Sequence, residues 1–416
     1  MKFMDIRITP SKLDGTVSVP SSKSITHRML ICAGLADGIS VIRNISFSKD
    51  IYATINAMTA LGAEFEINKG SVTVTGIGRK SAENAVIDCC ESGSTLRFMI
   101  PVAAVLGTAA EFRGQGRLPK RPITPYIREM SDKGIIFKYD NTMPFSISGK
   151  LKGGKYCLEG DISSQFITGM LLALPLAEND SEIIMTSPLQ SKPYADMTVR
   201  CLENFGIEIN ETDNGYYIKG NQHYKPYNTA VEGDYSQAAF FFVADAIGNN
   251  VKISNLADES IQGDKKIVEI ISALCYNDIR NEKSVYSVDA ENIPDLVPVL
   301  AVLCSLSGKT AEITGIERLK IKESDRIIST ADMINSLGGK AIPSDDSLLI
   351  KPVDSFIGGT VDSCGDHRIV MSAAIAATRA RGDVVILNAD AVEKSYPDFF
   401  NDFNNIGGKA NVINVE

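Results

Sequence analysis

The chain has 416 residues, of which 44% are hydrophobic and 22% charged, which is enough to bury two or three globular cores. Its 42 basic and 51 acidic residues give a net charge of −9, which argues against general affinity for nucleic acid or anionic membranes. An anionic metabolite would therefore need local clusters of basic residues. The first residues lack the apolar stretch of a signal peptide, and no run of about 18 apolar residues occurs, so we expect a cytoplasmic chain that does not cross a membrane.

The cysteines and histidines exclude several kinds of site. Eight cysteines are scattered without a CxxC pair or metal-type spacing, and there are only three histidines. We therefore expect no zinc site, and interpret the cysteines as reduced core thiols rather than a disulfide framework. No GxxxxGK[ST] loop occurs, so ATP chemistry of the P-loop kind is not indicated.

The chain repeats a small polar residue in front of an apolar helical segment. The six positions are Ser24, Ser94, Ser164, Ser236, Asp295 and Asp366, separated by 70, 70, 72, 59 and 71 residues. A residue that ends a second helix keeps the same interval, at Gly62, Gly134, Gly206, Asn277, Gly338 and Gly407. A period near 70 residues indicates one supersecondary unit per repeat, and therefore six units in the chain.

The first two repeats show the order of elements. The first contains predicted helices at 24–38 and 50–62, each followed by a strand, at 40–45 and 63–67. The second has helices at 92–107 and 123–134, followed by strands at 110–114 and 135–139. This alternation of helices and strands is an α/β pattern.

Six units suggest two lobes of three repeats each, because several units are needed to close a core. The polar stretch before residue 232 marks the boundary, so we expect one lobe at 21–230 and a second at 231–416. The strand within residues 1–20 precedes the first helix, and we expect it to complete the last repeat of the second lobe. The chain would then cross between the lobes twice, which makes a natural pair of hinges.

The repeated serines and aspartates are predicted to cap helices, and a helix start attracts anions through its free amides and its dipole. Each basic residue near these positions is, taken alone, well explained as a solvated surface charge. Together they favour an anion-binding cleft. The set comprises Lys23, Arg28, Arg97, Arg121, Lys192, Lys322, Arg326, Arg368 and Lys394.

The segment IKESDR carries the sharpest of these signals. On a helix, Lys322 and Arg326 would share one face and repel unless an anion lay between them. Glu323 and Asp325 could equally neutralise them, and spacing alone leaves both interpretations open.

Four further features each have two interpretations. Ser163, Ser164 and Gln165 offer more polar groups than one cap needs, which suits either a phosphate or an over-capped helix. Gly93 permits close approach of a ligand to the backbone, or forms a plain turn. Asp295 is either a cap or a carboxylate that the helix dipole keeps ionised to accept a proton. His367 is more often a structural donor than a catalyst.

Nine strings then identify a family. SSKSITHR, ESGSTLR, RPIT, DISSQF, SKPY, IPD, IKESDR, GDHR and KSYPDFF, in this order, resemble the 3-phosphoshikimate 1-carboxyvinyltransferases (EPSP synthases), a family of enolpyruvyl transferases, from about residue 12 to 408. The resemblance implies a two-lobed inside-out α/β barrel. Each lobe would have three βαβαββ repeats, with helices inside, sheets outside and helix starts facing the gap between the lobes.

The resemblance also implies a reaction of the shikimate pathway, which leads to chorismate and the aromatic amino acids. The enolpyruvyl group of phosphoenolpyruvate is transferred to the 5-hydroxyl of shikimate 3-phosphate, with release of phosphate, by addition and elimination through a tetrahedral intermediate. No metal or organic cofactor is required. We expect a monomer whose partners are these two small molecules.

The matching motifs imply the site residues. The set for shikimate 3-phosphate is Lys23, Ser24, Arg28, Ser163, Ser164, Gln165, Ser191, Tyr194, Asp295 and Lys322. The set for phosphoenolpyruvate is Lys23, Gly93, Arg121, Gln165, Arg326, Arg368 and Lys394. Asp295 is the candidate base for the hydroxyl, and Glu323 or Lys23 would give and later remove the methyl proton. We predict that Arg326→Ala or Lys394→Ala impairs use of phosphoenolpyruvate with the fold intact.

Two positions depart from the family pattern: Glu91-Ser92-Gly93-Ser94 replaces the common Asn-Ala-Gly-Thr, and Arg318 replaces a common asparagine. One alternative is the related UDP-N-acetylglucosamine enolpyruvyl transferase, but its loop cysteine is missing here and the GDHR string is foreign to it. The other is a nonenzymatic repeat scaffold, which predicts helix starts without a cluster of basic residues.

Overall fold

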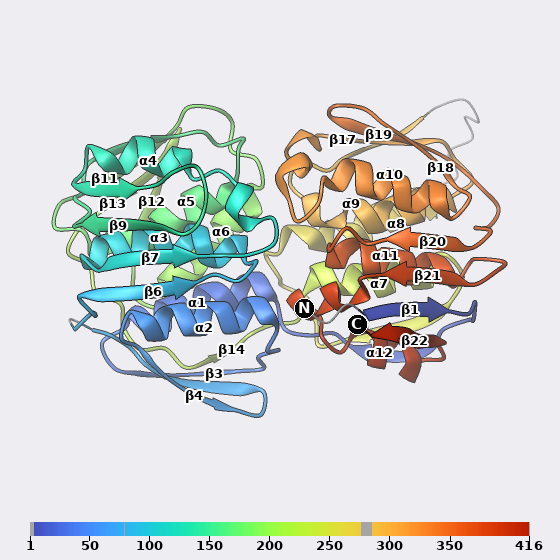
Figure 1. Cartoon of the computed structure of the whole chain (residues 1–416), viewed down its shortest axis with the longest axis horizontal. Helices are drawn as coiled ribbons and strands as arrows, with labels where there is room; N and C mark the ends of the chain where they lie inside the picture. Colours follow the sequence, from blue (N-terminus) through green and yellow to red (C-terminus); the bar gives the residue numbers. More distant parts are fainter. Residues whose placement is uncertain (1–3, 79, 276–284, 416) are drawn as a thin grey trace. The chain divides into compact units, whose positions relative to one another are not determined.

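The computed structural model describes residues 4–78, 80–275 and 285–415, and these form two compact units (Figure 1). The contiguous unit is Ser21–Glu232, coloured blue to green. The split unit combines the segment that ends at Pro20 with the segment that begins at Gly233, which is coloured yellow-green to red. Each unit has its own hydrophobic core.

The contiguous unit contains three repeats in the described part of the chain. Its α-helices are α1 (Lys23–Leu35), α2 (Lys49–Ala60), α3 (Gly93–Leu106), α4 (Thr124–Ser131), α5 (Ser164–Ala173) and α6 (Lys192–Asn204). Its strands are β3 (Ile39–Arg43), β4 (Glu64–Asn68), β5 (Ser71–Thr75), β6 (Asn84–Asp88), β7 (Ala109–Arg113), β8 (Ile135–Lys138), β9 (Phe145–Gly149), β10 (Lys155–Leu158), β11 (Ser181–Met185), β12 (Ile209–Thr212), β13 (Gly215–Ile218) and β14 (Thr229–Ala230). Two 3₁₀ turns complete it, η1 (Leu118–Lys120) and η2 (Leu174–Leu176).

The split unit follows the same plan. Its α-helices are α7 (Tyr235–Ala246), α8 (Ile267–Cys275), α9 (Val297–Ser305), α10 (Arg326–Ser336), α11 (His367–Ala377) and α12 (Phe399–Asn405). Its strands are β1 (Met4–Ile8), β2 (Asp14–Ser18), β15 (Asn250–Ser254), β16 (Tyr286–Asp289), β17 (Ala311–Thr314), β18 (Lys340–Pro343), β19 (Ser347–Lys351), β20 (Gly359–Asp362), β21 (Val384–Leu387) and β22 (Ala410–Val415). Its 3₁₀ turns are η3 (Gly263–Lys266), η4 (Pro294–Leu296), η5 (Glu317–Ile321) and η6 (Ala389–Lys394).

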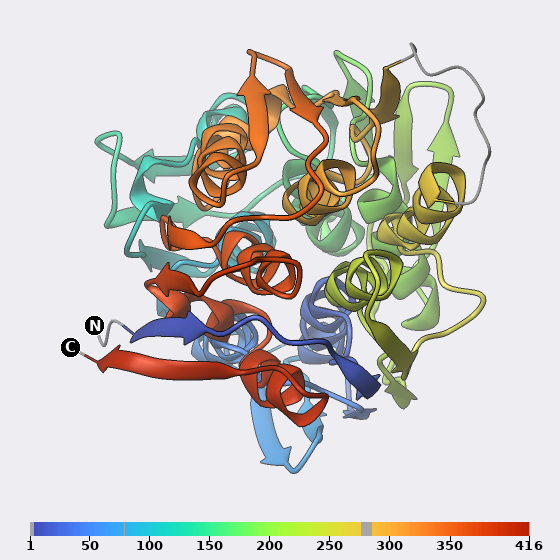
Figure 2. The same cartoon turned by 90° about the vertical axis from the view of Figure 1, so that its right-hand side faces the viewer.

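The sheets repeat one strand order. In β6-β7-β9-β8, β10-β11-β13-β12 and β16-β17-β19-β18, the first pair is parallel and the other two pairs are antiparallel. The sheets β14-β3-β5-β4 and β20-β21-β1-β22 obtain one strand each from a distant part of the sequence. Figure 2 shows the deep-blue β1 beside the red β22, and β1 pairs with β21 on its other edge. The α/β class with βαβαββ repeats is therefore confirmed.

Burial explains why these segments take their places. The first helix of each repeat is mostly apolar and largely buried, and α3 and α11, for example, are buried along almost their whole length. Strands alternate instead: Val72 and Val74 of β5 face the core, whereas their neighbours do not. Central helices covered by half-buried sheets are what the inside-out arrangement requires within each unit.

The predicted caps are wrong by one or two residues for the four serines. The side chains that accept the first amides belong to Ser22, Ser92, Ser163 and Asp234, so Ser24, Ser94, Ser164 and Ser236 lie inside the first turn. Asp295 lies in η4 and caps no helix, while Asp366 caps α11 as predicted. The reason is that each segment carries two polar residues, and the earlier one reaches the free amides.

The residues predicted to end the second helix of each repeat are confirmed wherever the structure describes them. The glycines at 62, 134, 206, 338 and 407 have φ between 77° and 112°, a left-handed range that only glycine adopts easily at a helix end. Asn277 lies outside the described residues. No helix in the described part of the chain combines the length and apolarity that a membrane crossing needs.

Candidate active site

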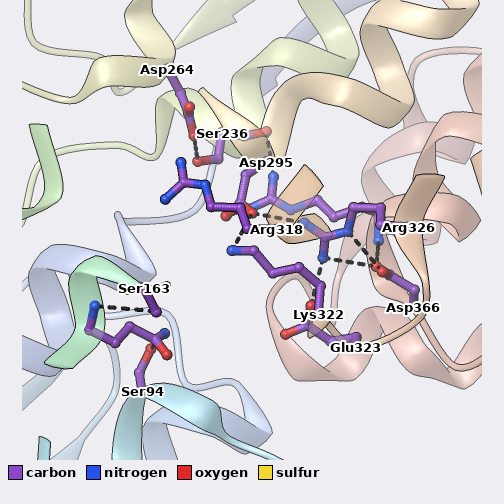
Figure 3. A network of polar contacts seen from close by, with 12 residues as sticks. Ser94, Ser163, Ser236, Asp264, Asp295, Arg318, Lys322, Glu323, Arg326 and Asp366 are labelled. Carbon is purple, nitrogen blue, oxygen red and sulfur yellow. Dashed lines mark hydrogen bonds and ion pairs between the residues drawn. The ribbon is translucent and has the colours of Figure 1, made fainter. Parts of the chain in front are cut away.

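In the split unit, four basic or acidic side chains meet at the starts of helices. Asp295 is held in η4, Lys322 directly follows η5, and Arg326 is the first residue of α10. Arg368 is the second residue of α11. Figure 3 shows Asp295, Lys322 and Arg326 directed toward one another. The expected helical face shared by Lys322 and Arg326 is wrong, because the chain between them is not helical.

Arg326 is the centre of this cluster and is only 1% exposed. Its guanidinium donates to Asp295 Oδ1 at 2.8 Å, to Glu323 Oε2 at 2.7 Å and to Asp366 Oδ2 at 2.9 Å. Burial opposes its charge, but Asp366, Glu323 and Asp295 outweigh that cost and raise the pKa of Arg326. The neutralising role left open for Glu323 is therefore real, although Asp366 and Asp295 share it.

Asp295 is surrounded by cations. Arg368 Nη2 donates to its Oδ2 at 3.1 Å, and Lys322 Nζ lies 3.7 Å from its Oδ1. Burial alone would raise the pKa of Asp295, but Arg368, Lys322 and Arg326 hold it well below the ordinary value. The carboxylate is thus ionised because of neighbouring side chains rather than the helix dipole expected from sequence.

The remaining predicted residues of the split unit lie beside these groups in the fold. Burial lowers the pKa of Lys322 to about 8. Lys394, at the end of η6, donates to the carbonyl of Gly365 at 2.8 Å, just before α11. Arg318 of η5 donates to the carbonyl of Glu291. His367 is buried.

In the contiguous unit, Lys23 and Arg28 occupy the first two turns of α1. Lys23 Nζ forms an ion pair with Asp50 Oδ2 at 2.9 Å. The buried Arg28 guanidinium donates to the hydroxyl of Thr198 at 2.8 Å and to the carbonyl of Tyr194 at 2.9 Å. Arg28 thereby ties the start of α1 to α6.

Gln165 joins the starts of α3 and α5. Its Nε2 donates to Ser94 Oγ at 3.0 Å, and its Oε1 accepts from Arg97 Nη1 at 2.6 Å. A methyl group on Gly93 would collide with the guanidinium of Arg121 and lie 3.5 Å from Gln165 Oε1. Gly93 is the first residue of α3 and is therefore glycine to leave room for these side chains, rather than to form a plain turn.

The last predicted residues precede α5 and α6. Ser163 caps α5, and its neighbour Ser164 is the first helical residue. Ser191 has φ of 55° and is buried in front of α6, close in sequence to Tyr194. Lys192 instead pairs with Asp196 and Glu211 on the exposed surface, where the interpretation as a solvated charge holds.

Two contributors carried no signal in the sequence. Asp50 accepts from Lys23 and Thr198 accepts from Arg28, yet they lie 27 and 170 residues from these partners. Asp366 is a predicted helix cap, but the sequence does not indicate its bond to Arg326, which lies 40 residues away. In the described part of the chain, no three His, Cys, Asp or Glu side chains are grouped to hold a metal.

The thiols are more varied than expected. Among the described residues, seven cysteines form no disulfide, and Cys32, Cys89, Cys201 and Cys304 of these are buried. Cys364 is exposed, so the interpretation of all cysteines as core thiols is wrong for this residue.

Comparison with known proteins gives one consistent result. A family model described as EPSP synthase (3-phosphoshikimate 1-carboxyvinyltransferase) matches residues 8–403. A 3-phosphoshikimate 1-carboxyvinyltransferase of Clostridium perfringens is 45% identical over 96% of this chain and 98% of its own length. Another, of Clostridium beijerinckii, is 41% identical over 99% of each. The solved EPSP synthase of Acinetobacter baumannii aligns with a TM-score of 0.82 at 25% identity, covering 99% of this chain and 100% of that one.

The repeated α/β units, with cations gathered at their helix starts, define an enzyme of the enolpyruvyl transferase class. Within that class, the chain belongs to the EPSP synthase family. The expected transfer from phosphoenolpyruvate to shikimate 3-phosphate is confirmed at the level of the family, and the UDP-N-acetylglucosamine alternative is not favoured. The reading as a nonenzymatic scaffold is not favoured either.

Proposed function

We propose that the chain transfers the enolpyruvyl group of phosphoenolpyruvate to the 5-hydroxyl of shikimate 3-phosphate by addition and elimination. The observation that carries this proposal is the Asp295 carboxylate, which receives hydrogen bonds from Arg326 and Arg368 with Lys322 close by. Cations that a carboxylate holds in the free protein can bind the phosphate and carboxylate groups of two substrates instead. Their number offsets the repulsion between two anions placed side by side.

We assign the binding sets as the family motifs imply. Shikimate 3-phosphate would contact Lys23, Ser24, Arg28, Ser163, Ser164, Gln165, Ser191, Tyr194, Asp295 and Lys322. Phosphoenolpyruvate would contact Lys23, Gly93, Arg121, Gln165, Arg326, Arg368 and Lys394. The polar contacts within each unit support these assignments, because Gln165 links the starts of α3 and α5.

Asp295 would accept the proton of the attacking hydroxyl. When substrate anions draw Arg326 and Arg368 away, the carboxylate loses the cations that lower its proton affinity and becomes a better base. Lys23 or Glu323 would protonate the methylene carbon and later remove the methyl proton. Lys23 is paired with Asp50, whereas Glu323 is bound by Arg326.

Deuterium exchange separates these two candidates. In deuterated water, turnover introduces deuterium at the methylene carbon, and the variant that loses exchange while still binding both substrates identifies the acid. Lys23→Arg keeps the positive charge and Glu323→Gln keeps the shape, so each tests the proton rather than the contact.

A phosphate-release assay tests the reaction itself. Phosphate should appear only when both phosphoenolpyruvate and shikimate 3-phosphate are present. Release with UDP-N-acetylglucosamine in place of shikimate 3-phosphate would contradict the proposal.

We further propose that the chain acts as a monomer in the cytoplasm. The exposed thiol of Cys364, which is in no disulfide, fits a reducing compartment, and each unit closes a core of its own. Light scattering after size-exclusion chromatography would detect a dimer, which would contradict the first part.

A further inference from the structure

Asp264 is a buried acid that the proposed reaction does not use. It lies in η3 of the split unit and is 3% exposed. The hydroxyl of Ser236, the second residue of α7, donates a hydrogen bond to its Oδ2, as Figure 3 shows.

Ser236 connects this acid to the candidate active site. Its main-chain carbonyl accepts a hydrogen bond from Arg368 Nη1 at 3.0 Å, and Arg368 Nη2 donates to Asp295 Oδ2 at 3.1 Å. Ser236 therefore binds Asp264 through its hydroxyl and Arg368 through its main-chain carbonyl. A change at Asp264 would reach the guanidinium across two hydrogen bonds.

The charges that face Asp264 come from three elements. Asp295 of η4 and Asp234, the cap of α7, repel a negative charge there, while Arg368 of α11 attracts it. Burial together with Asp295 raises the pKa of Asp264 to about 7, although the Ser236 hydroxyl and Arg368 work in the opposite direction. Asp264 thus changes its charge near neutral pH, at a fixed position beside Arg368.

We propose that Asp264 is a positioning residue that orients Arg368 through Ser236 and weakens phosphoenolpyruvate binding when it ionises. This inference rests on the proposed role of Arg368 in binding that substrate. Below neutral pH the protonated acid is uncharged, so the positive charge of Arg368 attracts the substrate in full. Above it, one added negative charge offsets part of that attraction, so binding weakens as the pH rises.

The test measures KM for phosphoenolpyruvate from pH 6 to 9 in the wild type, Asp264→Asn and Asp402→Asn. One buried charge near the site should raise the wild-type KM by about three- to tenfold across this range. Asp264→Asn should hold the low-pH value throughout. Asp402 is a matched control, because it is a partly buried acid that accepts from the Tyr396 hydroxyl at 2.6 Å, and its variant should follow the wild type. The titration of phosphoenolpyruvate itself cancels in this comparison.

Ser236→Ala distinguishes a role that depends on the ionisation of Asp264 from a purely structural role. Loss of the hydroxyl removes a donor that favours the ionised acid, so the midpoint of the KM profile should move to higher pH. A structural role would change KM equally at every pH. An unmoved midpoint overturns the proposal, and this variant decides the matter if Asp264→Asn does not fold.

A direct readout keeps this inference distinct from the proposed function. The carbon-13 carboxyl signal that is present in the wild type and missing in Asp264→Asn should titrate near pH 7 in the free protein. That measurement needs no turnover, so it stands even if phosphate release fails. A signal that stays ionised down to pH 5, or an Asp264→Asn enzyme with the wild-type KM profile, would overturn the inference.

Discussion

Arg326 and Lys394 are both assigned to phosphoenolpyruvate, but the fold depends on them to different degrees. Arg326 is buried and hydrogen-bonded to three carboxylates, whereas Lys394 donates to one main-chain carbonyl. Removing a partner from a buried ionic cluster leaves uncompensated charge, which costs far more than losing a half-buried lysine.

We predict that Arg326→Ala loses about 3–5 kcal/mol of unfolding free energy along with phosphoenolpyruvate use. Lys394→Ala should raise KM for phosphoenolpyruvate with the unfolding transition nearly unchanged. This revises the sequence-based expectation that both variants keep the fold intact. Urea unfolding and steady-state kinetics on both variants provide the check. An unfolding free energy of Arg326→Ala equal to that of the wild type would refute the prediction for that variant. Unchanged kinetics of Lys394→Ala would refute the prediction for Lys394.

Lys322 gives a pH dependence of its own. Burial lowers its pKa to about 8, so above that pH the free protein loses a positive charge that shikimate 3-phosphate would need. With the lysine about one-tenth protonated at pH 9, affinity should be about tenfold weaker than at pH 7. Lys322→Arg stays charged and should remove this dependence.

Isothermal titration calorimetry of shikimate 3-phosphate at pH 7 and pH 9 measures this difference. Lys320→Arg is a suitable control, because Lys320 is an exposed residue paired with Asp345. Equal affinity at the two pH values in the wild type would show that Lys322 keeps its proton.

At this scale, the sequence indicated the cations but only some of the groups that hold them. Arg28, Arg326 and Arg368 lay in recognisable motifs, and all three are buried. Glu323 is close to Arg326 in the sequence, whereas Thr198, Asp295 and Asp366 are distant from their partners and are brought to them only by the packing of helix starts. Spacing alone therefore could not separate these residues from Lys192, which has the same motif context and an exposed ion pair.

At the scale of elements, a chain of buried side chains joins three helices of the contiguous unit. Nδ1 of His27 (α1) lies 2.7 Å from the Thr54 hydroxyl (α2), which lies 2.7 Å from the Thr95 hydroxyl (α3). Thr95 donates to Ser92 Oγ at 2.9 Å. Since each hydroxyl has one hydrogen, Thr54 must donate to Thr95 and His27 to Thr54. Burial, with Lys23 and Arg28 nearby, holds the pKa of His27 well below its usual value, which keeps the ring neutral.

We predict that Thr54→Val costs about 1–3 kcal/mol of stability, because it leaves the His27 N–H without an acceptor in a buried site. Thr54→Ser restores the hydroxyl and should recover most of that loss. The row of hydrogen-bonded side chains ends at Ser92, the residue before Gly93. In Thr54→Val, KM for phosphoenolpyruvate should therefore rise more than KM for shikimate 3-phosphate. Denaturant unfolding and kinetics of both variants check this, and equal stability of the valine and serine variants would argue against it.

Element positions could be predicted well because local signals agreed. Apolar runs and terminal glycines placed α3 and α4 within a few residues of their observed bounds. The caps could not be placed, because Ser22 and Ser24, or Ser92 and Ser94, are chemically equivalent in the sequence. The choice depends on which residue enters the extended conformation, and tertiary packing decides that.

At the scale of the whole molecule, the two units differ in how the chain builds them. Every strand pair in the described part of the contiguous unit lies within 21–232, including β14 with β3. The split unit instead needs the N-terminal segment: β1 fills the gap between β21 and β22, and β2 pairs with β15. Ile6, Ile8 and Val17 of that segment are buried in its core.

We therefore predict that residues 21–232 fold alone with a cooperative unfolding transition, whereas residues 233–416 alone do not. Loss of Ile6 and Ile8 removes about 1.5–3 kcal/mol each of apolar burial, and β21 and β22 lose their central partner. Because Met4 pairs with Val415, a short linker from residue 416 to residue 1 should restore folding in a permuted fragment, 233–416 followed by 1–20. Circular dichroism melts of the three fragments test this. A cooperative melt of 233–416 without the added segment would show that β1 is dispensable. The repeats alone would then define the folding unit, without the strands that the N-terminal segment contributes.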